Sequence, residues 1–121
     1  PTLDIDALER IRKMQQPGRE SILHKVLKLY LDGTPELLEK MQTACAEADA
    51  QSLRGFAHSL KSSSANLGAL SVSTQCQNIE LSSGRGELAG MEQLIQQLKA
   101  DYLIVEQALK AILSSEAELS S

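Results

Sequence analysis

The most informative stretch of this chain is residues 57–69, which read Ala-His-Ser-Leu-Lys-Ser-Ser-Ser-Ala-Asn-Leu-Gly-Ala. When successive residues are rotated by about 100°, as in an α-helix, the apolar side chains in and just before this stretch fall on one face. That face holds Leu53, Phe56, Ala57, Leu60, Ser63, Ser64 and Leu67. His58 points in the opposite direction. The sequence therefore predicts a helix that buries its aliphatic face and presents one imidazole to solvent.

The predicted outer face of this helix also carries two cations and two small side chains. It holds Arg54, His58, Lys61, Ser62 and Ala65. An unprotonated imidazole nitrogen is a nucleophile near neutral pH. The ammonium of Lys61, one turn along, can neutralise charge on a phosphoryl group attached to the ring, an attraction of roughly 1–4 kcal/mol for charges ~4 Å apart. Ser62 and Ala65 leave room for a docking partner, and Gly68 is expected to end the helix in the left-handed conformation.

These residues resemble the signature of histidine-containing phosphotransfer (HPt) domains. The family pattern is Ala-His-x-Leu-Lys-Gly-x-Ser-x-x-x-Gly-Ala, and this chain supplies Ala57, His58, Leu60, Lys61, Ser64, Gly68 and Ala69 in register. The similarity extends upstream to Asp49, at the expected start of the histidine helix, and downstream to Cys76, Ile79 and Glu80, where the family often shows Cys-x-x-Leu-Glu. Ser62 departs from the pattern because the family usually has glycine there. Serine is still small, so we expect the ring to stay accessible.

The resemblance implies a phosphorelay intermediate from a hybrid sensor histidine kinase or a phosphorelay protein. By this resemblance, a receiver domain bearing an aspartyl phosphate is expected to dock on the His58 face, and a ring nitrogen, most often Nε2 in this family, to attack phosphorus. The phosphoryl group is then expected to pass to an aspartate of another receiver. Phosphoryl transfer depends mainly on positioning and charge stabilisation, so the Mg²⁺ site can belong to the receiver. The expected partners are therefore response-regulator receiver domains, and we expect no cofactor or metal on this chain.

One ring nitrogen of His58 must be held or solvated while the other reacts. Glu80 matches a family position on the following helix where Gln or Glu can hold that nitrogen, and Gln77 is an alternative partner. A plain solvent carboxylate, or a salt bridge to Arg54, is an equally open interpretation of Glu80. The second histidine, His24, lacks the motif and is expected to be an ordinary surface residue.

Composition and charge limit the other functions. The chain has 121 residues, 42% hydrophobic content, two Tyr, one Phe and no Trp, which fits one domain with an aliphatic core. Its net charge of −4 and pI near 5.1 argue against nucleic-acid binding, which needs a basic surface. No nucleotide-binding loop or glycine-rich kinase motif is present, so the chain is not expected to phosphorylate itself from ATP. Cys45 and Cys76 lack metal-site spacing and are expected to be buried, reduced thiols.

Capping and breaking residues predict the helices of the amino-terminal half. Asp4 caps a short first helix that residues 16–18, Gln-Pro-Gly, break. A second runs from about Arg19 to Leu31 and ends at the Asp-Gly pair of residues 32–33. A third opens at residues 34–35, where threonine can cap and proline can take the first helical position.

Three further helices are expected in the carboxyl-terminal half. The histidine helix runs from about Ala50 to Leu67, and the next begins after Gly68 and closes at residues 82–86. The last carries a heptad-like stripe of Leu88, Met91, Ile95, Leu98, Tyr102, Val105, Leu109 and Ile112. The predicted fold is all-α, an up-down four-helix bundle with two additional short N-terminal helices, as the resemblance also implies. Residues 1–113 form the domain, and residues 114–121 form a polar tail expected to fray.

No apolar run approaches the ~20 residues needed to cross a bilayer, and no signal pattern opens the chain. We expect a cytoplasmic location, free-standing or as the cytoplasmic C-terminal domain of a membrane-bound hybrid kinase. The chain starts at Pro1 without methionine, which fits either a domain of a longer protein or a processed start.

Two alternative functions stay open from the sequence. One is the histidine-bearing substrate domain (P1-like) of a chemotaxis-type kinase, which is phosphorylated by an ATP-binding domain and usually has a carboxylate on its histidine. The other is a helical adaptor that dimerises through the heptad stripe of the last helix. The stripe is also needed to cover the other amphipathic helices, so the sequence favours a monomer.

Overall fold

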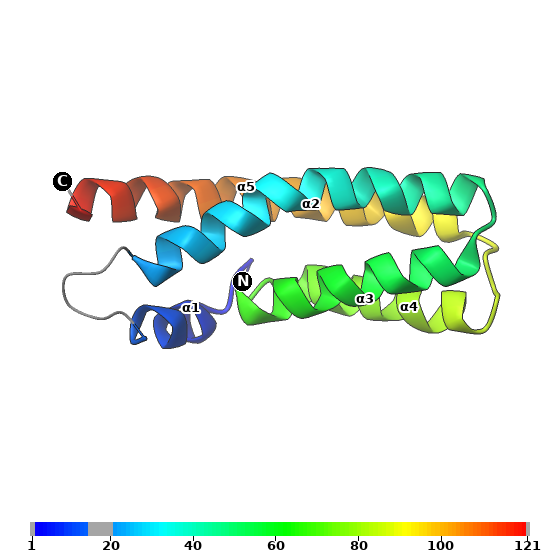
Figure 1. The fold of residues 1–121 in the computed structure, drawn as a ribbon, viewed down its shortest axis with the longest axis horizontal. Helices are drawn as coiled ribbons and strands as arrows, with labels where there is room; N and C mark the ends of the chain where they lie inside the picture. Colours follow the sequence, from blue (N-terminus) through cyan, green and yellow to red (C-terminus); the bar gives the residue numbers. More distant parts are fainter. Residues whose placement is uncertain (1, 15–20, 121) are drawn as a thin grey trace.

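The protein is an antiparallel bundle of helices. The structure is a computed structural model that describes residues 2–14 and 21–120, except for the side chains of 116–120. Within these residues it contains no strand and five helices: α1 (Ile5–Arg12), α2 (Ile22–Ala46), α3 (Ala50–Asn66), α4 (Leu70–Gly84) and α5 (Met91–Ser120). Helices α2 to α5 run alternately up and down; α2 and α5 form one layer, α3 and α4 form the other, and α3 packs against both α2 and α4 (Figure 1). The predicted all-α four-helix bundle is confirmed.

Helix α1 packs against α2 beside the turn that joins α3 to α4. The Asp4 side chain caps α1 by accepting a hydrogen bond from the Asp6 N–H, as the sequence predicts. Leu8 and Ile11 are buried in the common core. The Asp4 N–H donates to the Gly68 carbonyl oxygen at 2.8 Å, so the amino-terminal segment is tied to the end of the histidine helix.

Helix α2 corrects the predicted boundary at residues 32–35. It continues through Pro35 from Ile22 to Ala46, so the second and third predicted helices are one element. Its buried residues keep helical spacing without interruption: Leu23, Leu27, Tyr30, Thr34, Leu38, Met41 and Ala44. The Thr34 hydroxyl donates to the Tyr30 carbonyl oxygen at 2.6 Å, inside the helix. Burial of one continuous face therefore outweighs the local break signals.

Among the residues that the structure describes, the bundle consequently has one short N-terminal helix rather than two. The predicted break at residues 16–18 and the start at Arg19 lie outside the described residues. In α2 the Ser21 side chain accepts the cap hydrogen bond from the His24 N–H.

The remaining helices follow the predictions more closely. The Asp49 side chain caps α3 by accepting from the Ser52 N–H at 3.1 Å, as expected. Helix α4 continues through residues 82–84, beyond its predicted end, and the buried Ser83 hydroxyl donates to the Ile79 carbonyl oxygen. Leu88 precedes α5 instead of belonging to it. Helical backbone extends to Ser120, whereas fraying of the 114–121 tail stays a prediction.

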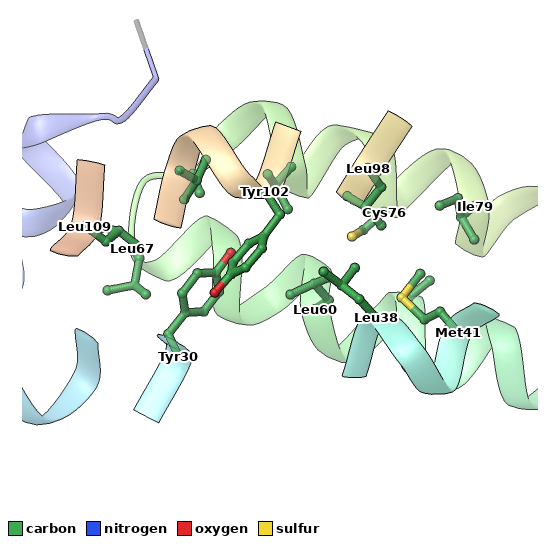
Figure 2. Close-up of a cluster of buried hydrophobic side chains, with 14 of the residues drawn as sticks. Tyr30, Leu38, Met41, Leu60, Leu67, Cys76, Ile79, Leu98, Tyr102 and Leu109 are labelled. Atoms are coloured by element: carbon green, nitrogen blue, oxygen red, sulfur yellow. The ribbon is translucent and has the colours of Figure 1, made fainter. Parts of the chain in front are cut away.

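The core lies between the four long helices and is mostly aliphatic (Figure 2). Two tyrosines lie near its centre: the Tyr30 and Tyr102 ring centroids are 5.9 Å apart. The hydroxyls of Tyr30 and Ser64 are 2.8 Å apart, so a hydrogen bond links α2 to α3 beneath the outer face. From α5 the core takes the stripe Met91, Ile95, Leu98, Tyr102, Val105 and Leu109. This stripe is covered by the chain's own helices.

The cysteines are both free thiols, but they differ in burial. Cys76 is buried, and this burial raises the pKa of its thiol to about 12. Cys45 is only half-buried, contrary to the expectation of two buried thiols. Across the described ranges, the helices lack the length and apolarity that crossing a membrane would require.

Candidate functional site

His58 lies on the outer surface of α3, where the helical spacing predicts it. Its side chain is 62% exposed, while Ala57 and Leu60 beside it in sequence are fully buried. Ser62 and Ala65, on the same face, are exposed. Small side chains therefore border the ring, and it is open to a molecule approaching from solvent.

Glu80 on α4 holds the ring. Its Oε1 lies 2.7 Å from Nδ1 of His58, and its Oε2 lies 2.7 Å from Nζ of Lys61. The Glu80 side chain is 15% exposed, so this single carboxylate bridges two side chains of α3 in a largely covered position. Of the partners the sequence left open, the structure selects Glu80. Gln77 is exposed on the same helix, one turn away.

The carboxylate of Glu80 is stabilised in its ionised form. The ion pair with Lys61, together with the hydrogen bond from His58, lowers the pKa of Glu80, although partial burial opposes the shift. An ionised carboxylate can only accept hydrogen bonds, so Nδ1 of His58 must carry the hydrogen. In the neutral ring, Nε2 is then the unprotonated nitrogen. This geometry fixes which nitrogen has a free lone pair.

Lys61 is placed differently from its sequence-based interpretation. Its side chain is only 29% exposed, whereas the helical spacing predicts an exposed lysine that can neutralise charge on a phosphoryl group. The ammonium contacts Glu80, so in this state it acts on the ring through the carboxylate. The Ser73 hydroxyl on α4 donates to the Lys61 carbonyl oxygen at 3.0 Å and helps to fix the two helices. Sequence reasoning missed Ser73, because a serine on a helix gives no signal of an interhelical bond.

Arg54 lies at the far end of this face. Its guanidinium group lies over Gly84 of α4, with Nε 3.4 Å from where a Cβ on that glycine would be. The salt bridge between Arg54 and Glu80 that the sequence allowed is not the arrangement observed, because His58 and Lys61 hold the two carboxylate oxygens.

Gly68 ends α3 as predicted and also allows a close contact. Its φ is +80°, and the Ala69 N–H closes the turn by donating to the Ser64 carbonyl oxygen at 2.9 Å. A Cβ at this position would lie 2.4 Å from the Asp4 carbonyl oxygen. Glycine is therefore required both by the backbone conformation and by the approach of the amino-terminal segment.

An exposed imidazole, held through Nδ1 by a carboxylate on an antiparallel four-helix bundle, defines a class of phosphoryl-accepting histidine domains. The comparisons agree with this class: the chain belongs to the Hpt domain family, whose model matches residues 25–113. Histidine phosphotransfer in phosphorelay signalling is the role of this family, and its members are carriers that work with receiver domains.

Two solved structures are similar over almost the whole chain. One is the histidine-containing phosphotransfer protein B (HptB) from Pseudomonas aeruginosa PAO1, with 30% identity, a TM-score of 0.88, and coverage of 95% of this chain and 96% of that one. The other is the HPT domain from the Hpt sensor hybrid histidine kinase from Shewanella, with 29% identity, a TM-score of 0.77, and coverage of 94% and 95%. Comparison with curated proteins gave no match.

Proposed function

We propose that Nε2 of His58 accepts a phosphoryl group from the aspartyl phosphate of a receiver domain and passes it to an aspartate of another receiver. The observation that carries this proposal is the 2.7 Å contact between Nδ1 of His58 and Oε1 of Glu80 on a ring that is 62% exposed. The contact leaves one nitrogen free, and the exposure makes that nitrogen reachable.

Atoms and charge are conserved in this transfer without loss of a proton from the ring. Nε2 forms the new P–N bond with its lone pair, the P–O bond of the aspartyl phosphate breaks, and the aspartate departs as a carboxylate. The ring, which still carries hydrogen on Nδ1, then bears a positive charge. Glu80 faces this charge directly and so stabilises the phosphorylated ring more than the free one.

The other predicted site residues have supporting roles. Lys61 keeps Glu80 ionised and supplies positive charge near the phosphoryl group, while Ser62 and Ala65 keep the approach open. Arg54 lies one turn from His58 and belongs to the surface that a receiver covers. Gly68 fixes the end of the helix.

In this proposal the chain acts as a carrier without kinase activity of its own. The sequence supports this because it contains no nucleotide-binding motif. The Mg²⁺ needed for transfer is supplied by the receiver, so this chain needs no cofactor. We place the domain in the cytoplasm, where receivers are found, and as a monomer, because the apolar stripe of α5 is covered within the chain.

Phosphotransfer from a panel of phosphorylated receivers tests the proposal. The wild-type chain should take label from at least one receiver, His58→Gln should take none, and the matched variant His24→Gln should behave as wild type. Label on the His58→Gln variant would overturn the assignment.

The carboxylate on the ring also favours a second candidate, the P1-like substrate domain of a chemotaxis-type kinase. Glu80 supplies the activating group that the resemblance associates with that class. The two functions differ in the donor. If a kinase ATP-binding domain phosphorylates His58 and no receiver does, the second candidate replaces the first.

A further inference from the structure

Helix α4 contacts Lys61 at both its backbone and its side chain. The Ser73 hydroxyl donates to the Lys61 carbonyl oxygen at 3.0 Å, and Oε2 of Glu80 lies 2.7 Å from Nζ of Lys61. A backbone carbonyl oxygen has two lone pairs, so it can accept from Ser73 and still serve the hydrogen bonding of its own helix. One residue of α3 therefore links Ser73 to the carboxylate that holds His58.

Ser73 and Glu80 lie on the same face of α4. They are seven residues apart, which places them about 10 Å from each other along the axis and within about 20° of the same direction. Cys76 and Ile79, which lie between them in sequence, are fully buried in the core. Because the helix is continuous from Leu70 to Gly84, a rotation or shift of α4 at Ser73 also moves Glu80.

The Ser73 hydrogen bond fixes α4 near its beginning. Within the described residues, no side chain caps the first turn of this helix, which starts four residues after the end of α3. The burial of Val72 and Cys76 attaches α4 to the core, but hydrophobic attraction is non-directional. A hydrogen bond depends steeply on distance and angle. The bond from Ser73 to α3 consequently restricts the rotation of α4 more sharply than the apolar contacts do.

The contact between Glu80 and His58 tolerates little movement. A side-chain tip lies about 5–6 Å from the helix axis, so a rotation of about 10° moves it by about 1 Å. Starting from 2.7 Å, such a movement takes Oε1 of Glu80 beyond hydrogen-bond distance of Nδ1. A neutral ring that is not held can carry its hydrogen on either nitrogen. With the hydrogen on Nε2, that nitrogen has no free lone pair for phosphorus.

We propose that Ser73 is a positioning residue for phosphotransfer: its bond to the Lys61 carbonyl sets the rotation of α4, keeps Glu80 on Nδ1 of His58 and so keeps Nε2 unprotonated. This inference rests on the proposed function and gives a role to a residue outside the sequence signature. Ser73 acts through Glu80 and not on the ring itself.

Three substitutions test this role. Ser73→Ala removes the hydroxyl and adds no atom, and Ser73→Thr keeps a hydroxyl and serves as the rescue variant. The matched control is Ser83→Ala. The buried Ser83 hydroxyl donates to the Ile79 carbonyl oxygen at 2.6 Å inside α4, so its loss removes a serine hydrogen bond from the same helix without removing a bond to α3.

The first measurement is the tautomer of His58 in the free chain. Nitrogen NMR of the ¹⁵N-histidine-labelled full chain, at a pH where the ring is neutral, shows which nitrogen carries the hydrogen. Wild type, Ser73→Thr and Ser83→Ala should carry it on Nδ1, whereas Ser73→Ala should share it between the two nitrogens. A wild-type spectrum for Ser73→Ala, or an equal change in Ser83→Ala, would overturn the inference.

The second measurement is the transfer rate from the receiver that phosphorylates the wild-type chain fastest in a panel. Ser73→Ala should slow transfer by about threefold or more, the size expected for loss of one hydrogen bond. In a Glu80→Ala background the same change should alter the rate by less than about twofold, because the two residues act through one set of contacts. Equal slowing in both backgrounds would mean a general structural role and would overturn the inference.

The two measurements separate failure of this inference from failure of the proposed function. If wild type accepts the phosphoryl group and Ser73→Ala changes neither the tautomer nor the rate, the role of Ser73 fails while the phosphocarrier function stands. If no receiver phosphorylates His58, the proposed function fails, and the role of Ser73 in phosphotransfer fails with it.

Discussion

Glu80 determines the chemistry of the site because its two oxygens serve two different partners. One oxygen fixes the hydrogen on Nδ1 of His58, and the other holds the ammonium of Lys61. The carboxylate therefore sets the tautomer of the ring and, under the proposed function, faces the positive charge that phosphorylation of Nε2 would give the ring. A neutral side chain of the same shape can do the first task but not the second.

Replacing Glu80 with glutamine should slow phosphotransfer while leaving His58 reactive. The amide oxygen can still accept from Nδ1, but charge-assisted hydrogen bonds are roughly twice as strong as neutral ones. We expect a fall of about tenfold in the transfer rate, equivalent to about 1.4 kcal/mol. Rapid-quench transfer from a phosphorylated receiver measures it. Gln77→Ala, an exposed change on the same helix, is the control, and a Glu80→Gln variant as fast as wild type would contradict this role.

The stability that Glu80 provides should depend on pH in a defined direction. Because its ion pair with Lys61 lowers its pKa, the folded state binds the proton less tightly than the unfolded state. Its contribution is therefore complete above the usual glutamate pKa of about 4.3 and is lost as pH falls through the lowered value. At pH values below the usual glutamate pKa, where Glu80 itself takes up its proton, urea unfolding should show a stability gap between wild type and Glu80→Gln that closes as pH falls further. A gap that widens as pH falls would contradict the assignment.

Lys61→Ala should slow transfer or shorten the lifetime of the phosphohistidine, severalfold, since the effect of one ammonium at a partly exposed site is about 1 kcal/mol. The domain should stay folded, because the side chain is not part of the core. Lys99→Ala removes a similarly covered lysine that pairs with Glu39, away from His58, and serves as the control. Equal rates and lifetimes for the Lys61 and wild-type chains would refute the role.

At the scale of the helices, the two ends of α3 determine where the site lies. Helix α3 begins at a side-chain cap on Asp49 and ends at Gly68, and α1 is bonded to that end through Asp4. The rigid span between the two ends carries His58 near its middle. Any change that moves the Gly68 turn thus disturbs both α3 and the amino-terminal segment.

Gly68→Ala should destabilise the domain by roughly 2–4 kcal/mol, because it combines a positive φ with a backbone clash. A Cβ there would lie 2.4 Å from the Asp4 carbonyl oxygen. Gly86→Ala is the matched control: its φ is +73° but no atom lies within 4 Å of the new Cβ. Thermal or urea unfolding measures the loss of stability in each variant. Similar losses for Gly68→Ala and Gly86→Ala would show that the contact with Asp4 is not tight.

The sequence predicted some helix boundaries and missed others for identifiable reasons. The cap at Asp49 and the end at Gly68 were predictable because a side-chain cap and a left-handed glycine act locally. The helix break predicted at residues 32–35 was wrong. It was predicted because each local sequence signal there favours the end of a helix. The apolar spacing of Leu27, Tyr30, Leu38 and Met41 continues through residues 32–35 and favours one continuous helix.

For the whole molecule, packing between helices decided what the sequence left open. The outward direction of His58 follows from the periodicity of one helix, so it was predictable. The choice between Glu80 and Gln77 depends on how α4 is rotated and shifted against α3, which buried contacts across the bundle determine. The partly buried position of Lys61 has the same cause.

The central claim is that Glu80 holds Nδ1 of His58 and leaves Nε2 to accept the phosphoryl group. Nitrogen and phosphorus NMR of the receiver-phosphorylated, ¹⁵N-histidine-labelled chain tests this claim most directly. We predict phosphorus coupled to Nε2 of His58, with the hydrogen remaining on Nδ1. Phosphorus on Nδ1, or on His24, would contradict the account.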